Sequence, residues 1–512
     1  MFIASGVYFA MSYRPFLIIL IFLICRATFG SEIRIGITSV PLNLNPLYAT
    51  DANSQNINRI THLSLIDFDE KMRSNCDACE NFSETISQSG DHEIRFTLKE
   101  GIKFWDGKSV TAKNVIDSYK YFIKPENKSN HARAFQNIKS IKIINDLEFI
   151  VIFKKYSIEN LNNLTLLKIL KINTSGEQVG CGEYKILEKS PLKVVLTPAF
   201  GESKPNLSFK VVKDETTLAL KIVNKELHLS LGGISPRKYK WLKKNTREYE
   251  YLEVPGTNYK YISFNHKNIH LSKHNVRKAI SKLIPRRELL KYKLHETAIL
   301  SNGLFSPSFG KFYINSQKVR YSADEATKLL LEEGYKKVKG KWYLNNKPVR
   351  LSWRVSNNKA TIEIVNLLKD KLAQFGFEIK VSVQEWGTFM KNVKKGNFDL
   401  IMGQWIGFTG PDMMRFIWHS DSVPPKGANR GHYINPDFDR ALNLAAGKLN
   451  ENERNSLYKK AQLIAENDFA YLGMWHPNIT WIKNKCVKGV KIFPNGGFLG
   501  LRDLKLVCNG ND

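Results

Sequence analysis

The spacing of apolar residues along the chain predicts strands and helices that follow one another in turn. Apolar and polar residues alternate over 94–98, which is the period of a half-buried strand. Thr111 then stands as the N-cap of a helix whose apolar stripe has helical spacing, at Val115, Ile116, Tyr119 and Phe122. This change of period favours an α/β fold in which helices cover sheets.

A helix and a strand follow one another again in the second half of the chain. A helical stripe over 364–375 ends at Gly376, and residues 377–383 then alternate as a strand. Another amphipathic helix is predicted over 457–465. Because no Pro- or Ser-rich linker separates these segments, we expect domains that the chain enters and leaves more than once.

The N-terminus has the order of features of a secretory signal. Arg14 precedes an apolar run from Phe16 to Cys25, and small residues follow it up to Gly30. The run is shorter than the roughly 20 residues that span a bilayer. We expect residues 1–30 to be a cleaved signal peptide and the protein to be periplasmic. A retained membrane anchor, with a lipid on Cys25, is the alternative.

Export makes disulfides possible, and two pairs of cysteines are candidates. Cys486 and Cys508 flank a short segment with a Pro-Asn-Gly-Gly turn, which predicts a bridged hairpin. Cys76 and Cys79 have the spacing of half a zinc site, of a redox pair or of a tight surface disulfide. The disulfide is favoured, because nothing completes the four ligands of a zinc site. Cys181 is then left over, and we expect it to be buried.

Composition bounds the class of protein. The chain has 512 residues, of which 43% are hydrophobic, and that share excludes a disordered chain. Its formal net charge of +29 raises nucleic acid as a partner, but export and the lack of a recognised nucleic-acid module argue against it. Two interpretations of the surplus positive charge stay open: it is an adaptation to an anionic cell surface, or it indicates an acidic ligand.

Catalytic signatures are missing from the sequence. There is no HExxH and no GxSxG motif, and the Gly101–Ser109 segment has five residues between its glycines where a P-loop needs four. His419, Ser420 and Asp421 are neighbours in one segment, whereas catalytic triads join distant segments. We therefore expect a binding protein and not an enzyme, with no cofactor and no metal. A cleft between domains is the usual place for such a site.

One segment carries a recognisable signature. Residues 96–115, FTLKEGIKFWDGKSVTAKNV, resemble the signature of the family 5 extracellular solute-binding proteins, the oligopeptide and dipeptide receptors of ABC importers. Further matches to that family follow in chain order at Leu44-Asn45-Pro46, 180–186, 261–265, 276–280, 326–335, 397–400 and 433–439. Together these matches cover nearly the whole chain beyond the signal.

The resemblance implies a bilobal periplasmic-binding-protein fold, the type II peptide-receptor subclass, with three domains that close like a clamp. Domain I would combine 31–56, 180–264 and 476–512, domain II would be 57–179, and domain III would be 265–475. The implied function is a monomeric periplasmic receptor of an ABC importer. It would capture a peptide-like or other small solute in the interdomain cleft and deliver it to a permease in the inner membrane.

The chain departs from the family where the ligand's α-ammonium is recognised. Peptide-binding members carry an Asp in the loop after a Trp, and Phe408 stands in its place here, with Asp412 displaced along the loop. Either the ligand lacks an α-amine, or Asp412 replaces the missing acid, or the protein is a receptor-fold protein without a transport role at an anionic cell surface. The expected ligand-binding residues are Asn45, Trp386, Trp405, Gly407, Phe408, Thr409 and Asp412.

Overall fold

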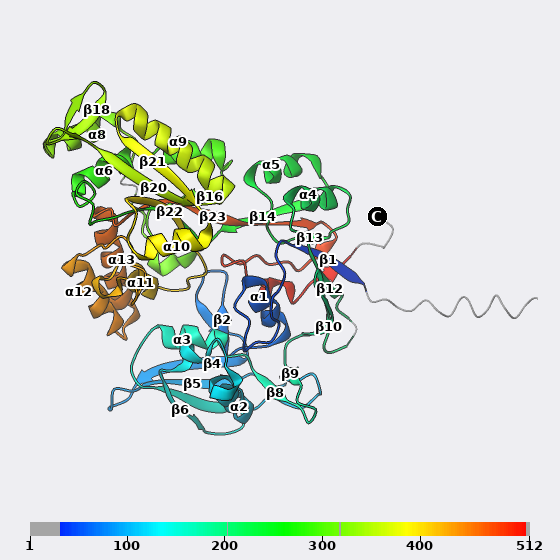
Figure 1. The fold of residues 1–512 in the computed structure, drawn as a ribbon. Helices are drawn as coiled ribbons and strands as arrows, with labels where there is room; N and C mark the ends of the chain where they lie inside the picture. Colours follow the sequence, from blue (N-terminus) through cyan, green and yellow to red (C-terminus); the bar gives the residue numbers. More distant parts are fainter. Residues whose placement is uncertain (1–30, 202, 317–318, 508–512) are drawn as a thin grey trace, which may run out of the picture.

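The protein has two lobes that meet around a central strand (Figure 1). The structure, a computed structural model, describes residues 31–201, 203–316 and 319–507. The predicted signal peptide, with Cys25, lies outside these residues. Within the described ranges no helix has an apolar stretch that could cross a bilayer.

A mixed sheet of twelve strands runs through both lobes. One half has the order β10 (Tyr184–Ser190), β11 (Lys193–Pro198), β12 (Asn206–Val211), β1 (Glu32–Ile37) and β13 (Leu229–Ser230). The other half has the order β15 (Tyr259–Phe264), β22 (Leu400–Trp405), β20 (Arg350–Ser356) and β21 (Glu378–Gln384). The long strand β23 (Tyr471–Asn484) lies between the halves, and β14 (Tyr249–Pro255) and β16 (Ala298–Leu300) pair with it.

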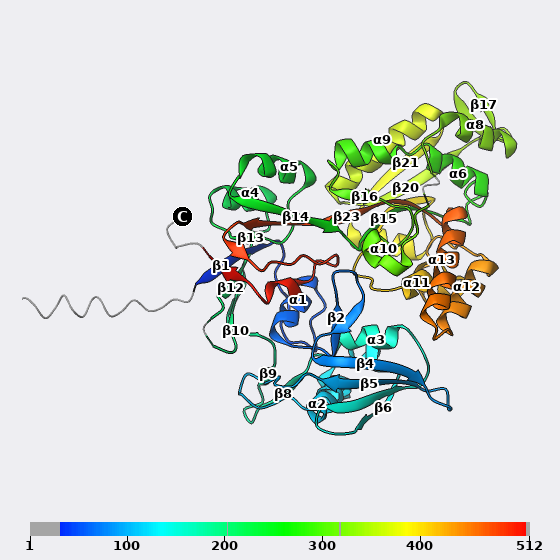
Figure 2. The same cartoon turned by 180° about the vertical axis from the view of Figure 1, so that it is seen from behind.

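Strand β23 belongs to both halves of this sheet. Its second part, from Asn478 onwards, pairs with β14, and its first part, up to Trp475, pairs with β15 (Figure 2). Residues 256–258 separate β14 from β15, so the chain crosses between the lobes here and again in the middle of β23. We call 31–255 with 478–507 the first lobe and 259–475 the second lobe. The three-domain division stays a prediction, and the pairing of β15 with β22 groups 259–264 with the second lobe.

The first lobe carries a second, antiparallel sheet of four strands. Its order is β4 (Cys79–Ile86), β5 (His92–Leu98), β7 (Glu148–Phe153) and β6 (Ile138–Ile143), and α2 (Ala112–Ile123) packs on it. The strand predicted over 94–98 is confirmed, and its apolar residues are buried. Thr111 is the N-cap of α2, as expected, and shares a capping box with Asn114.

The predicted disulfide between Cys76 and Cys79 is present at the start of β4. It joins β3 (Ser74–Cys76) to β4, which follows it directly in the chain. Cys181 is free and buried, as expected. The predicted bridge from Cys486 ends on Cys508, which lies outside the described residues.

Helices cover the second lobe's sheet on both faces. One face packs against α6 (His274–Lys282), α8 (Ala323–Glu332) and α9 (Lys359–Phe375), and the other packs against α10 (Trp386–Lys394). The predicted helix, glycine stop and strand are confirmed as α9, its C-cap Gly376 and β21. The helix predicted over 457–465 is part of α13 (Glu451–Asn467). It packs with α11 (Asp412–Trp418) and α12 (Pro436–Ala446) in the part of the lobe that faces the four-stranded sheet (Figure 1).

The stop at Gly376 gives a test of the fold. Gly376 has a φ of +115°, and an added Cβ would lie 2.5 Å from the carbonyl oxygen of Gly340. Gly376→Ala should therefore lower the free energy of unfolding by about 1–3 kcal/mol, measured by denaturant titration. The control is Gly447→Ala at the end of α12, where φ is −93° and the nearest atom to an added Cβ is 3.9 Å away. Equal losses in the two variants would contradict this account of the stop.

Candidate functional site

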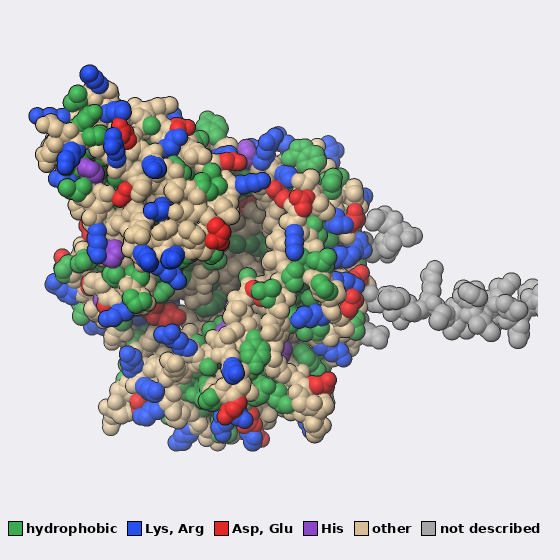
Figure 3. All heavy atoms as spheres, in the orientation of Figure 1, with side chains coloured by type: hydrophobic (Ala, Val, Ile, Leu, Met, Phe, Trp, Pro, Cys, Tyr) green, Lys and Arg blue, Asp and Glu red, His purple; other side chains and the backbone are tan. Residues whose placement is uncertain are grey.

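A hollow opens between the two lobes in the space-filling view (Figure 3). A cavity of about 350 Å³ has walls from both lobes, including residues of β4 and α13. We call it the interlobe cavity. The first lobe contributes residues such as Ser74, Tyr156 and Asn162, and the second lobe contributes Arg454 and the segment 409–411. Because both lobes supply its walls, the cavity depends on how the lobes are placed.

The loop from β22 to α11 carries most of the predicted site residues. Trp405 stacks on Tyr261, with 5.8 Å between ring centroids. Gly407 is exposed at a turn with a φ of +69°, and Thr409 lines the interlobe cavity. The loop therefore reaches from the sheet of the second lobe to the surface that faces the first lobe.

Phe408 does not point into the interlobe cavity. Its side chain is 8% exposed and stacks on Phe309 of the short helix Pro307–Phe312, with 5.5 Å between ring centroids. Phe68 and Met72 of the first lobe are buried in the same hydrophobic cluster. An apolar contact between the lobes thus occupies the position where the family resemblance led us to expect a carboxylate.

Two carboxyl groups from opposite lobes lie beside this apolar contact. Glu159 belongs to α3 (Glu159–Asn163), and its Oε1 lies 3.2 Å from where a Cβ on Gly410 would be. Burial, and then the charge of Asp412, raise the pKa of Glu159 to about 8. Burial also raises the pKa of Asp412 to about 6, although Arg415 and Tyr458 act to lower it. At neutral pH this region therefore holds a proton on Glu159.

Arg454 of α13 makes a polar contact between the lobes. Its Nη1 donates a hydrogen bond of 2.6 Å to the hydroxyl of Tyr156, and two backbone carbonyls accept from the same nitrogen. The guanidinium carbon also lies 5.8 Å from the centroid of the Tyr156 ring. Arg454 is 8% exposed and its Nε has no partner in the structure. The side chain is thus fixed at the wall of the interlobe cavity.

A larger cavity, of about 410 Å³, lies over β15 and β22 in the second lobe. We call it the β22 cavity. Trp386, the first residue of α10, lines it and is 59% exposed. Lys260 of β15 donates a hydrogen bond of 3.1 Å to the hydroxyl of Thr361, and burial lowers the pKa of its ammonium to about 8. The guanidinium of Arg430 lies 5.0 Å from the ring centroid of Trp405.

Asn45 lies in a turn before α1 (Ala52–Thr61) and lines neither cavity. Its side-chain oxygen accepts hydrogen bonds from the backbone of Leu47 and from Gln178, and its carbonyl accepts from Tyr48 and Ala49. The structure thus brings Thr409 and Asp412 to the lobe interface and Trp386 to the β22 cavity, while Asn45 shapes the chain.

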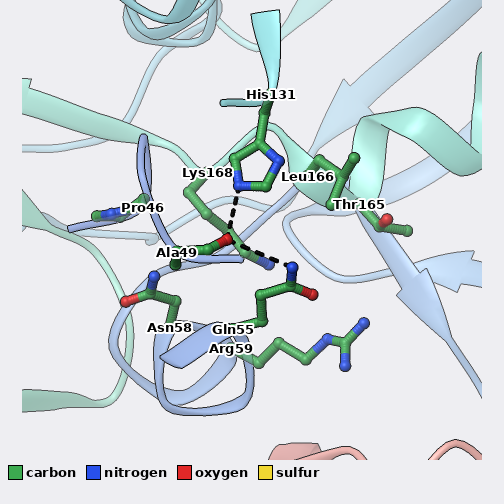
Figure 4. A pocket seen from close by; sticks show the side chains of 9 residues that line it. All are labelled: Pro46, Ala49, Gln55, Asn58, Arg59, His131, Thr165, Leu166 and Lys168. Atoms are coloured by element: carbon green, nitrogen blue, oxygen red, sulfur yellow. Dashed lines mark hydrogen bonds between the residues drawn. The ribbon is translucent and has the colours of Figure 1, made fainter. Parts of the chain in front are cut away.

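A third, small cavity lies where α1 meets the part of the first lobe that carries the four-stranded sheet (Figure 4). His131 and Gln55 both donate to the carbonyl of Ala49, over 2.8 and 3.3 Å. Lys168 is buried beside them and donates to the hydroxyl of Ser64. At about 20 Å³ the cavity has room for about one water. The cavity lies at a packing interface within the first lobe and is too small to hold a solute.

Sequence reasoning missed Lys260, Arg430, Tyr156, Glu159 and Arg454. No motif marks them, because each acts through neighbours that are distant in the sequence. Lys260 alone left a signal, since it interrupts the apolar run of residues 259–264. A charged residue inside such a strand indicates either an exposed edge or a site.

Comparison with known proteins agrees with this architecture. The sequence profile of the bacterial extracellular solute-binding proteins, family 5, matches residues 82–427. The oligopeptide-binding protein AppA of Bacillus subtilis is 25% identical, over 91% of this chain and 90% of its own. The probable D,D-dipeptide-binding periplasmic protein DdpA of Escherichia coli is 24% identical, over 95% and 97%. The solved ABC transporter substrate-binding protein CtaP of Listeria monocytogenes has a TM-score of 0.80 at 20% identity, over 93% and 99%. The expected bilobal fold is confirmed.

The raised pKa of Glu159 predicts how stability changes with pH. The folded protein holds a proton that an unfolded Glu releases near its ordinary pKa of 4.5, so this contribution to stability is lost as pH rises towards about 8. Burial raises the pKa values of the neighbouring Tyr156 and Tyr458, so these phenols keep their protons. We expect the melting temperature of Glu159→Gln to fall less than that of the wild type between pH 5 and pH 8.5.

The matched control for this pH effect is Glu100→Gln, an exposed acid of the first lobe. Its melting temperature should follow the wild type across the same pH range. A parallel decline in the wild type and in Glu159→Gln would show that Glu159 does not carry the effect.

The packing of Phe408 predicts that the family's carboxylate cannot simply be restored. Phe408→Asp removes a buried ring and leaves an unpaired charge in an apolar cluster, which should cost about 3–5 kcal/mol of unfolding free energy. Ile406→Asp, two residues earlier and 68% exposed, should change it little. Denaturant titration compares the two, and a Phe408→Asp protein as stable as the wild type would contradict the buried position.

Proposed function

Because the chain belongs to the bacterial extracellular solute-binding proteins of family 5, we propose that it is the substrate-binding component of an ABC importer. The observation that carries the proposal is the interlobe cavity, whose walls come from two lobes joined only by the crossovers at 256–258 and β23. A solute enclosed there contacts both lobes, so binding favours the closed arrangement. A permease can then distinguish loaded from empty receptor by the placement of the lobes.

Closure is supported by two kinds of contact between the lobes. The apolar cluster of Phe68, Met72 and Phe408 removes hydrocarbon from water, which is favourable and non-directional. The hydrogen bond from Arg454 to Tyr156 depends on orientation, so it fixes how the lobes meet. The role is capture without chemical change, in keeping with relatives that are named for binding.

Location and partners follow from the same proposal. We expect the mature protein to be a periplasmic monomer, released from residues 1–30 by signal cleavage, with an ABC permease of the inner membrane as its partner. The solute class of the named relatives, oligopeptides and dipeptides, is the first class to test.

A receptor-fold protein without a transport role is the second candidate. It is favoured by the net charge of +29 and by Lys and Arg side chains that are spread over the visible face (Figure 3). Such a protein would bind anionic vesicles or polysaccharide in a way that moderate salt abolishes, because exposed charges are screened.

The deciding experiment is to identify what the purified protein retains. Native mass spectrometry should find a small solute bound after export, and small-angle X-ray scattering should show a smaller radius of gyration with it than after refolding without it. Salt-sensitive binding to anionic vesicles, with no retained solute and no compaction with a peptide digest, would favour the second candidate and reject transport.

The contact between Arg454 and Tyr156 makes closure testable by substitution. Tyr156→Phe removes one hydrogen bond between the lobes; if solute binding depends on this contact, affinity for the retained solute should fall roughly three- to tenfold. Tyr292→Phe, at a position that is 69% exposed, is the control and should bind like the wild type. Calorimetry measures both, and unchanged affinity in Tyr156→Phe would mean that the contact does not contribute to capture.

A further inference from the structure

The β22 cavity is positively charged and has no acidic residue in its lining. We propose that it binds the carboxylate of the captured solute between Lys260 and Arg430, with the apolar part of the solute against Trp386. This inference rests on the proposed receptor function and names the chemical class of the solute. It places the acidic end of the solute in a cavity of the second lobe and not in the interlobe cavity. The carboxylate is the C-terminus of a peptide or belongs to a free organic acid.

The lining residues carry the first argument. The two cations are accompanied by neutral polar groups and by apolar and aromatic ones, which are Tyr261, Ser356, Asn357, Asn358, Thr361, Trp386, Phe389, Met390, Ile401, Met402, Gly403, Gln404 and Ile406. The interlobe cavity differs, because Glu84 and Glu451 line it together with its cations. The interlobe cavity thus has acids among its cations, whereas the charged residues of the β22 cavity are cations alone.

Lys260 carries the second argument. It lies on β15 between the buried residues Tyr259 and Tyr261, and it forms no ion pair with any residue that the structure describes. Two other Lys side chains with little exposure, Lys282 and Lys483, pair with Glu325 and Glu250. The buried Lys168 has no ion pair among the described residues, but Asp67 and Asp77 lie near enough to favour its charged form. A partly buried ammonium without a counter-charge is costly, and a bound carboxylate would offset that cost.

Arg430 carries the third argument. Its guanidinium carbon lies 5.0 Å from the Trp405 ring centroid, and the guanidinium N–H groups donate to no acceptor among the described residues, so they are available to a carboxylate. Within the described ranges it has no ion-pair partner either. The preceding residue, Asn429, is buried and donates to the carbonyls of Trp418, His419 and Tyr433, so the segment is held in place. Arg430 is thus positioned before any solute arrives.

The burial of Phe408 agrees with an anionic solute. With that side chain packed against Phe309, position 408 offers no carboxylate to an α-ammonium. The β22 cavity of the same lobe offers two cations instead. Recognition of the solute would then begin from its negative end.

The test compares acids with their neutral derivatives. The protein is stripped of bound solute by unfolding and refolding, then mixed with a casein peptide digest before and after methyl esterification, and with hippurate or hippuramide. Native mass spectrometry should find the free acids bound and the esters and the amide unbound. Retention of peptides or of hippurate distinguishes the two sources of the carboxylate.

Substitutions locate the contact. Lys260→Gln and Arg430→Gln should each weaken binding of the retained acid roughly ten- to hundredfold, because each removes a charge-assisted hydrogen bond. Lys380→Gln, an exposed position on β21 of the same lobe, is the matched control and should bind like the wild type. Equal binding of acid and ester, or unchanged affinity in both variants, would overturn this inference and leave the receptor function standing.

Two further outcomes separate this inference from the receptor function. Binding of no probe at all by the wild type would overturn this inference, and the absence of any retained solute would overturn the receptor function.

Proton uptake gives a second readout that a merely structural lysine would not produce. A bound anion should raise the pKa of Lys260 from about 8, so binding at pH 8.5 should take up protons. The other titratable groups of the lining are Arg430 and Tyr261, and burial holds the pKa of Tyr261 well above its usual range. Calorimetry in two buffers of different ionisation enthalpy should detect the uptake in the wild type and not in Lys260→Gln. Identical enthalpies in the two buffers for the wild type would contradict the assignment.

Discussion

The pairing of β23 with strands of both lobes is the constraint on which the rest of the structure depends. A strand that keeps its hydrogen bonds to β14 at one end and to β15 at the other can bend or twist between them, but it cannot let the lobes separate. The middle of β23 is also crowded, because a Cβ on Gly256 would lie 2.2 Å from the carbonyl oxygen of Pro477. Motion of the lobes is thus limited to the crossovers, and the loop after β22 is carried towards the first lobe in a defined direction.

Charge is distributed differently at the two cavities. At the lobe interface, Glu159 and Asp412 come from opposite lobes, and burial favours their protonated forms. In the β22 cavity, Lys260 and Arg430 come from one lobe and have no acid beside them. At neutral pH a proton on Glu159 therefore reduces the charge at the interface, whereas a bound anion would balance the charge of the β22 cavity. Phe408 makes the contact between the lobes apolar at the position where the family resemblance predicts an amine-binding acid.

Local patterns predicted the elements that depend on local forces. The strand at 94–98 and the helix from Thr111 follow from apolar period and capping, which act over a few residues. The stop at Gly376 follows from the backbone freedom of glycine. The Cys76–Cys79 disulfide could also be predicted from the sequence, because both cysteines belong to one short segment. The resemblance to the family located the loop from Trp405 to Asp412. It did not predict the direction in which each side chain of the loop points.

The sequence by itself determined the family, the α/β class and the position of the altered loop. Each of these depends on short motifs, or on motifs that follow one another in a fixed order along the chain. Tertiary structure alone decided which side chains share a cavity. Glu159 faces a residue of the other lobe near Gly410, and Arg430 lies on Trp405 of a different strand. No local pattern encodes such neighbours, since they are brought together by packing and strand pairing across hundreds of residues. The same physical reason explains Lys260, whose lack of a counter-charge becomes visible only when every neighbour in the folded lobe is known.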